Sequence, residues 1–259
     1  MTTTPAPELV DGPEPRSEHV GELVYRHRLT TRLWHWTNAV AIVVMLMSGL
    51  MISNAHPHLY WGEYGANFDR AWFNPPSFPG WATIPSTYNL ALARHWHLFF
   101  AWVFAWGLFA FLIASLVNRH IARDLTLTRR EVSPRHLWQD VKDHLRLKFP
   151  TGQEALRYNP IQKITYILVI FVLIPLLIVT GLSLSPGFDA VMRWPMALMG
   201  GRASARSIHF ICAGGIASFI VVHLVLVVLA GPINEVRSMI TGRYRVPPDP
   251  EPVVVEEPA

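Results

Sequence analysis

Residues 208–230 read IHFICAGGIASFIVVHLVLVVLA, and this stretch decides the fold. It contains no Asp, Glu, Lys or Arg, and it exceeds the roughly 20 apolar residues that a helix needs to cross a bilayer. One such charge at the centre of a spanning helix would cost about 2.5–3.5 kcal/mol on insertion scales. The stretch is therefore predicted to span a membrane, and the two histidines inside it need a separate explanation.

Three further stretches are equally apolar and also lack charged residues: Leu33–Ile52, Trp96–Leu116 and Ile164–Leu184. Of the 259 residues, 51% are hydrophobic and 15% are charged, whereas a soluble domain usually carries about 25% charged residues. The sequence therefore predicts an all-α fold, an integral membrane four-helix bundle.

The basic residues indicate how the bundle is oriented. With four spans, both termini lie on the same side as the middle loop, and that side carries 17 of the 22 Lys and Arg residues. The positive-inside rule places this side in the cytoplasm. We expect a multi-pass protein of the bacterial inner membrane with both termini cytoplasmic. The excess of Lys and Arg residues is accounted for by their position on the cytoplasmic side, so no nucleic-acid partner is expected.

Composition also predicts the domain limits and the connections. Residues 1–24 are acidic with no signal sequence, and residues 246–259 are rich in Pro and Glu. Both are predicted to be disordered cytoplasmic ends, so that residues 25–245 form the membrane domain. An amphipathic helix is predicted after Ser133-Pro134, a kink at Pro175, and an aromatic external loop over Asn54–Arg94. We identify no internal repeat.

Four of the twelve histidines lie within the spans or at their edges: His35, His97, His209 and His223. His209 and His223 are fourteen residues apart on one helix. They therefore point in nearly the same direction and are about 21 Å apart along the axis. His35 lies at the depth of His223, and His97 at the depth of His209. Each level thus offers two imidazoles from two helices.

Two imidazoles at one level are what a planar haem needs on its two faces. The single cysteine, Cys212, excludes a CxxCH attachment site, so histidine must hold any redox iron. Arg32 at the inner level, with Arg94 and Arg206 at the outer level, could pair with haem propionates. With two histidines per iron no axial position is left for substrate, and the chemistry would be electron transfer.

Other readings of the histidines stay open. A single histidine within a span is as often a residue that bonds the backbone of a neighbouring helix as it is a ligand. The pairs His95/His97 and His56/His58 could form a surface zinc site. His95 could also replace His97 as a ligand, although it precedes the apolar run and lies beside Arg94.

The sequence resembles the bacterial cytochrome b561 / nickel-hydrogenase cytochrome b superfamily, which includes the gamma subunit of formate dehydrogenase. Within it the likeness is greatest to the thiosulfate reductase cytochrome b subunit group. The resemblance covers residues 25–245. It is carried by RLWHW (32–36), SGLMISNAHPHLYWGEYG (48–65), RHWHLFFAW (94–102), YNPIQKITY (158–166) and HLVLVVLAGPINEVRSMITGRY (223–244).

The resemblance implies two b-type haems ligated by His35, His97, His209 and His223. It also implies a quinone as exchangeable substrate and a partner redox subunit, in relatives often a periplasmic molybdenum oxidoreductase. Polar side chains at the inner level are candidates for contact with the quinone, namely Asn38, three residues after His35, and Asn118, Tyr166 and Asn234 at the inner span ends. The chain would then be an electron-transfer subunit of a respiratory oxidoreductase. The rivals are a stand-alone quinone-linked cytochrome b that reacts with superoxide or metals, and a transporter with histidine proton relays.

Overall fold

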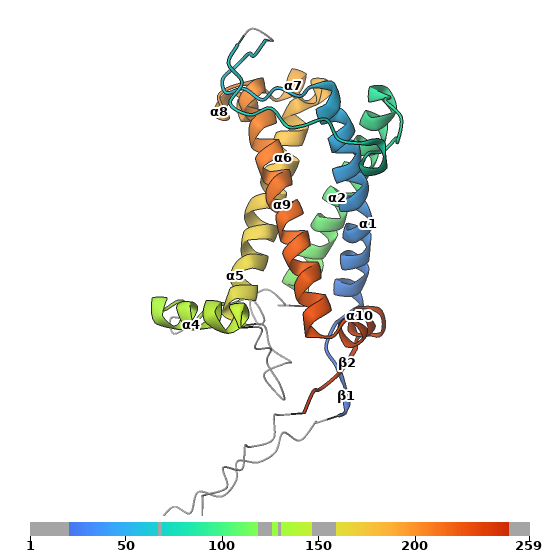
Figure 1. The fold of residues 1–259 in the computed structure, drawn as a ribbon, viewed down its shortest axis with the longest axis vertical. Helices are drawn as coiled ribbons and strands as arrows, with labels where there is room; N and C mark the ends of the chain where they lie inside the picture. The colour runs from blue at the N-terminus through green and yellow to red at the C-terminus, as the bar shows by residue number, and fades with distance from the viewer. Residues whose placement is uncertain (1–20, 67–68, 119–125, 129–130, 147–158, 249–259) are drawn as a thin grey trace, which may run out of the picture.

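The computed structural model describes residues 21–66, 69–118, 126–128, 131–146 and 159–248. Four long helical segments run side by side (Figure 1), namely α1 (Leu29–Ala55), α2 (Leu90–Val117), a third segment over Pro160–Leu184 and α9 (Arg202–Ala230). All four are long and apolar enough to cross a membrane. The predicted all-α membrane bundle is confirmed.

The third segment is a composite helix. It consists of α5 (Pro160–Leu168), a π-helical turn η3 (Val169–Leu173) and α6 (Ile174–Leu184). Pro175 has no amide hydrogen for the carbonyl of Phe171, and the helix widens just before it, so that the Ile174 amide donates to the Val169 carbonyl. The irregularity that the sequence predicted at Pro175 is therefore a π-helical turn.

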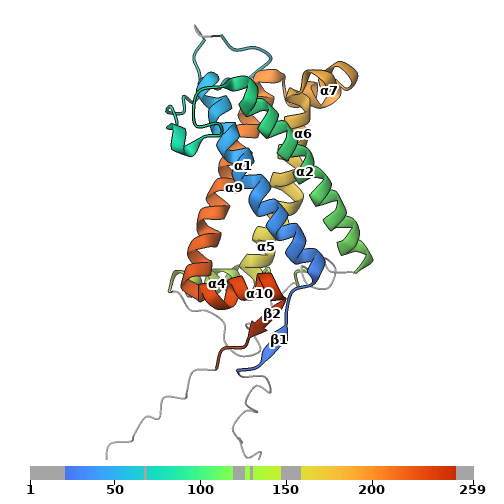
Figure 2. The same ribbon diagram turned by 90° about the vertical axis from the view of Figure 1, so that its right-hand side faces the viewer.

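The helices pack mainly as two pairs, α1 with α2 and α6 with α9. Figures 1 and 2 show the four segments crossing as two hairpins. A buried apolar cluster joins both hairpins halfway along the bundle, and it receives side chains from α1, α2, the third segment and α9: Ala41, Phe104, Leu108, Phe111, Val169, Ile170, Ile174 and Ile216. This layer separates the two ends of the bundle.

At one end, here called the loop end, lie the connections between paired helices. They are residues 56–89, with the short helix η1 (Gly80–Ala82), and the helices α7 (Pro186–Val191) and α8 (Trp194–Leu198). The segment over residues 56–89 is rich in aromatic side chains, as expected. Trp61 stacks on Trp72 with ring centroids 5.4 Å apart.

The opposite end, here called the terminal end, carries α4 (Pro134–Leu145), α10 (Pro232–Thr241) and a two-stranded sheet. In Figure 1, α4 lies across the direction of the bundle. It is the amphipathic helix predicted after Ser133. A salt bridge of 2.7 Å from Lys163 to Glu131 links the segment before α4 to α5. This partner lowers the pKa of Glu131 to about 2.

A two-stranded sheet lies at the predicted limits of the membrane domain. Strand β1 (Leu23–Tyr25) pairs antiparallel with β2 (Arg243–Arg245). The ladder continues beyond the strands, since the Gly21 amide donates to the Val246 carbonyl and the Val246 amide to the Glu22 carbonyl. Residues 21–24 and Val246 are therefore held in place by backbone hydrogen bonds. Residues 1–20 and 249–259 lie outside the described residues.

Candidate functional site

The structure brings the four histidines of the spans together as two pairs. At the loop end, His97 of α2 faces His209 of α9, with ring centroids 6.1 Å apart and ring planes at 63°. At the terminal end, His35 of α1 faces His223 of α9, with centroids 6.3 Å apart and planes at 61°. We call these the loop-end pair and the terminal-end pair.

The spacing within each pair fits one metal ion held between two imidazoles. Two metal–imidazole bonds of about 2.0–2.1 Å, together with the distance from each nitrogen to its ring centre, amount to roughly 6 Å. The observed 6.1 and 6.3 Å agree with this value. Each pair could therefore hold a haem iron by its two axial positions. Their role as iron ligands stays a prediction.

The loop-end pair is held by hydrogen bonds from neighbouring helices. Nδ1 of His97 lies 3.1 Å from Ser48 Oγ and 3.1 Å from the Met45 carbonyl oxygen, both on α1. Nδ1 of His209 lies 2.8 Å from Thr180 Oγ1 on α6. Each ring thus has a hydroxyl partner on the preceding helix of its own hairpin.

The terminal-end pair has a different environment. Trp34 stacks on Phe111 at 4.0 Å, and Phe219 lies parallel to His223 at 5.8 Å. Four polar side-chain atoms of α1 are buried here without a hydrogen-bond partner among the described residues: Arg32 Nε, Trp34 Nε1, His35 Nδ1 and Asn38 Oδ1. Buried polar atoms are almost always paired, so this cluster has the character of a site that binds a polar ligand.

The three candidate arginines lie near the two pairs. Arg94 and Arg206 each precede a loop-end histidine by one helical turn. Arg94 Nη2 donates to Nε2 of His56 at 3.3 Å. Arg206 donates to the His58 carbonyl, and its buried Nε has no partner among the described residues. Burial, then Arg206 and Arg94, lower the pKa of His56. The loop end is thus a compact cationic site that suits propionate groups.

The stretch AHPHLYWG, residues 55–62, acquires a structural explanation. Ser207 of α9 donates to the Tyr60 carbonyl at 2.6 Å. Gly62 and Ser204 exchange two hydrogen bonds, from the Gly62 amide to Ser204 Oγ at 2.7 Å and from the Ser204 amide to the Gly62 carbonyl at 3.1 Å. The stretch therefore joins the end of α1 to the first turn of α9 and satisfies an unpaired amide of that turn.

The structure also bears on the open alternatives. His95 is exposed, whereas His97 is partly buried against α1, which favours His97. Among the described residues no group of three or more His, Cys, Asp or Glu side chains could hold a metal ion. The surface zinc site therefore has no support there.

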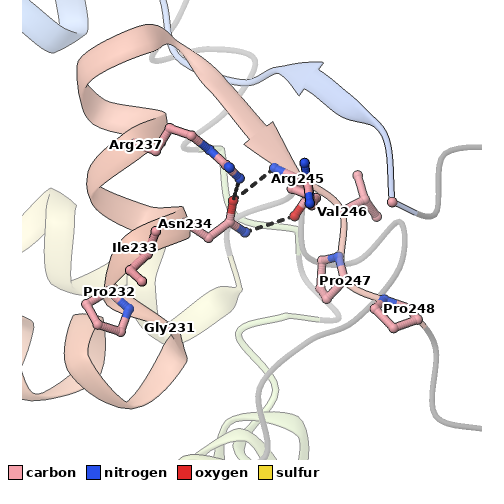
Figure 3. A pocket seen from close by; sticks show the side chains of 10 residues that line it. Gly231, Pro232, Ile233, Asn234, Arg237, Arg245, Val246, Pro247 and Pro248 are labelled. Atoms are coloured by element: carbon pink, nitrogen blue, oxygen red, sulfur yellow. Dashed lines mark hydrogen bonds between the residues drawn. The ribbon is translucent and has the colours of Figure 1, made fainter.

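Two further polar groups of the terminal end have structural roles. Asn118 is the C-cap of α2. Asn234 of α10 bonds both backbone groups of Arg245 and accepts from Arg237 (Figure 3). A pocket of about 430 Å³ lies beside it, lined by α10, the segment after β2 and Gly21. None of the four paired histidines lines it.

Sequence reasoning missed Ser48 and Thr180, although a repeat in the sequence could have identified them. The tripeptides Ser48-Gly49-Leu50 and Thr180-Gly181-Leu182 occupy equivalent places on α1 and α6. The next spanning helix of each hairpin carries R-x-x-H, as Arg94 to His97 and Arg206 to His209. The two hairpins thus share these short motifs, which the sequence-based prediction did not use.

Comparison with known proteins agrees with this architecture. A Cupriavidus necator protein provisionally named as a Ni/Fe-hydrogenase B-type cytochrome subunit is 25% identical over 85% of this chain and 86% of its own. An Azospira oryzae protein provisionally named as the YedZ1 subunit of a protein-methionine-sulfoxide reductase is 26% identical over 80% of this chain and 92% of its own. Escherichia coli cytochrome YdhU is 26% identical over 87% of this chain and 76% of its own.

No solved structure matches the chain significantly. The profile of the prokaryotic cytochrome b561 family matches residues 26–242, which contain all four spanning segments and both histidine pairs. The chain therefore belongs to the prokaryotic cytochrome b561 family, as a membrane cytochrome of the b type.

Proposed function

We propose that the chain carries electrons between the quinone pool and a partner redox subunit through two b-type haems. The observation that supports this most is the presence of two facing histidine pairs at opposite ends of one bundle, at 6.1 and 6.3 Å. A bound haem supplies a reversible one-electron centre. Two histidines would hold each haem iron, His97 with His209 and His35 with His223, and the chemistry supplied would be electron transfer.

The remaining candidate residues have defined tasks in this proposal. Arg94 and Arg206 would neutralise propionates at the loop end, and Arg32 would do so at the terminal end. The apolar layer around Leu108 and Ile170 would exclude water between the two levels.

The quinone is proposed to react at the terminal end. Asn38 is 7% exposed, and its Oδ1 has no partner among the described residues. It lies one turn beyond His35 on α1, where a quinol hydroxyl could donate to it. The terminal end is proposed to face the cytoplasm, on the basis of the 17 basic residues on that side.

The partner subunit is proposed to dock on the loop end, outside the membrane. The connection over residues 56–89 exceeds the about 12–15 residues beyond which loops are usually functional or disordered. Its backbone and Trp72 are bonded to α9, so it offers a firm surface. Trp61, Tyr64 and Trp81 are exposed on it, which suits a protein interface.

Two classes of enzyme are candidates for the partner subunit. The resemblance to the thiosulfate reductase group favours a periplasmic molybdenum oxidoreductase. The relatives named as hydrogenase cytochromes favour a nickel–iron hydrogenase as second candidate. A stand-alone oxidoreductase would need no partner. Metal analysis of the complex purified by a tag on this chain separates them, because molybdenum, nickel or neither would accompany it.

The central test is the haem content and redox titration of the purified protein. We expect two haems per chain that acidified acetone extracts, and two waves in the titration. One haem per chain, or colour that resists extraction, would contradict the proposal. A second test concerns the orientation. A reporter that works only in the cytoplasm should be active when it is fused after Ala259. Activity of alkaline phosphatase fused at the same place would show that the C-terminus lies outside the membrane and would contradict the proposed orientation.

A further inference from the structure

The two loop-end histidines are held in the same way by different halves of the chain. Ser48 on α1 contacts His97 of the next helix, and Thr180 on α6 contacts His209 of the next helix. The glycine that follows each hydroxyl lets the ring lie close to the helix. A Cβ on Gly49 would lie 3.4 Å from Cε1 of His97, and one on Gly181 3.3 Å from Cε1 of His209. We call each hydroxyl–glycine pair a clasp.

The hydrogen bonds of the clasps decide which ring nitrogen carries the proton. Ser48 Oγ donates its single hydrogen to α1, where the Val44 carbonyl lies at 2.7 Å and the Met45 carbonyl at 3.2 Å. Its oxygen can then only accept from His97. The Met45 carbonyl, at 3.1 Å from the same Nδ1, is also only an acceptor. Nδ1 of His97 must therefore bear the hydrogen.

The same argument applies to His209. Thr180 Oγ1 donates within α6, to the Leu176 carbonyl at 2.7 Å and the Leu177 carbonyl at 3.1 Å, so it accepts from Nδ1 of His209. Both loop-end imidazoles thus keep the lone pair on Nε2, the tautomer that can bind a metal ion through that nitrogen.

We propose that Ser48 and Thr180 are positioning residues that fix the loop-end imidazoles as Nε2 ligands and lower the midpoint potential of the loop-end centre. This inference rests on the proposed function. A hydrogen bond from Nδ1–H makes Nε2 more electron-rich. A more basic axial ligand stabilises the oxidised iron, which carries the larger positive charge. The terminal-end centre lacks this effect at His35, whose buried Nδ1 has no partner among the described residues.

The test is a redox titration of Thr180→Val, Ser48→Ala and the double variant. Valine keeps the shape of threonine and removes the hydroxyl, which accepts from Nδ1 of His209 and donates to the Leu176 carbonyl. The Met45 carbonyl remains as an acceptor for Nδ1 of His97, and both loop-end histidines are still present, so the haem should be retained. We expect the loop-end wave to move to higher potential in each single variant and further in the double variant, with the terminal-end wave unmoved. The low-spin EPR signal of the loop-end centre should shift in parallel.

The chain offers matched controls. Ser183 is also fully buried on α6 and donates to the carbonyl four residues before it, Val179, but no hydrogen bond joins it to a histidine. Ser183→Ala should leave both waves in place, and Thr180→Ser should retain the wild-type potential. The wave lost in His209→Ala identifies the loop-end centre.

The outcomes separate the two proposals. A wild-type protein without two waves would contradict the proposed function and this inference with it. Two wild-type waves, with a loop-end wave unmoved in the double variant, would contradict only the role of the clasps. So would an equal shift in Ser183→Ala, because a general change of packing in α6 would then explain the result.

Discussion

The two histidine pairs share their spacing but differ in how the protein holds them. At the loop end, hydroxyl and carbonyl oxygens of α1 and α6 bond to the rings. At the terminal end, Arg32, His35 and Asn38 each keep a buried polar atom without a partner among the described residues. Rings whose Nδ1 atoms are bonded are held rigidly, whereas unpaired polar atoms cost about 1–3 kcal/mol each until a ligand bonds them. The difference favours an electron-transfer centre with fixed ligands at the loop end. It favours a site where a polar ligand binds and leaves at the terminal end.

The largest expected effect comes from removing one histidine of a pair. His209→Ala should lower the haem content from two to one per chain and abolish the loop-end wave, and His97→Ala should do the same, because one axial ligand cannot replace two. His35→Ala and His223→Ala should abolish the other wave. Haem extraction measures the haem content per chain, and redox titration measures the number of waves.

His95→Ala is the control for this experiment, since His95 is exposed. It should retain both haems. Loss of a haem in His95→Ala but not in His97→Ala would overturn the assignment on α2.

A smaller effect is expected from Asn38→Leu. This substitution removes a polar group of the terminal end and keeps a side chain of similar size. Quinol-driven haem reduction should slow roughly tenfold, the rate change that corresponds to about 1.4 kcal/mol in the barrier. Thermal stability should be unchanged or raised, because Oδ1 of Asn38 has no protein partner among the described residues to lose. Stopped-flow reduction and a melting curve measure the two quantities.

Asn118→Ala is the corresponding control at the C-cap of α2, and its quinol kinetics should match the wild type. If Asn38→Leu also reacts at the wild-type rate, the quinone binds elsewhere.

At the glycines of the clasps we expect an effect on thermal stability alone, with both haems still bound at room temperature. Gly181→Ala places a methyl group 3.3 Å from the His209 ring, and such overpacking costs typically 1–3 kcal/mol. The loop-end haem should be lost at a lower temperature, as followed by its absorbance. Gly214→Ala adds the same methyl group where no atom lies within 4 Å, so it should be neutral. Equal behaviour of the two variants would show that the clasp tolerates the methyl group.

The spans and the histidine pairing could be predicted from the sequence, because absence of charge and a helical period are local properties. Fourteen residues are nearly four helical turns, so one face of α9 determines both pairs. The role of residues 55–62 could not be predicted, since their bonding partners, Ser204 and Ser207, lie more than 140 residues away.

The clasps were missed for a different reason. A single serine or threonine in an apolar helix commonly bonds its own backbone, as Ser48 and Thr180 also do. Their contact with a histidine becomes visible only when the hairpins are assembled. The β1–β2 pairing was missed because three-residue strands carry almost no periodic signal.

The fourteen-residue separation of His209 and His223 also has an electrical consequence. About 21 Å of helix axis corresponds to roughly two-thirds of a hydrocarbon core about 30 Å thick. On the proposed function, an electron that passes between the pairs crosses that share of the membrane voltage. At about 2.3 kcal/mol per charge per 100 mV, a membrane potential of that size would change the free energy of the transfer by roughly 1.5 kcal/mol. This changes the equilibrium constant for electron transfer between the two centres by close to tenfold. The membrane potential would therefore help determine which centre holds the electron.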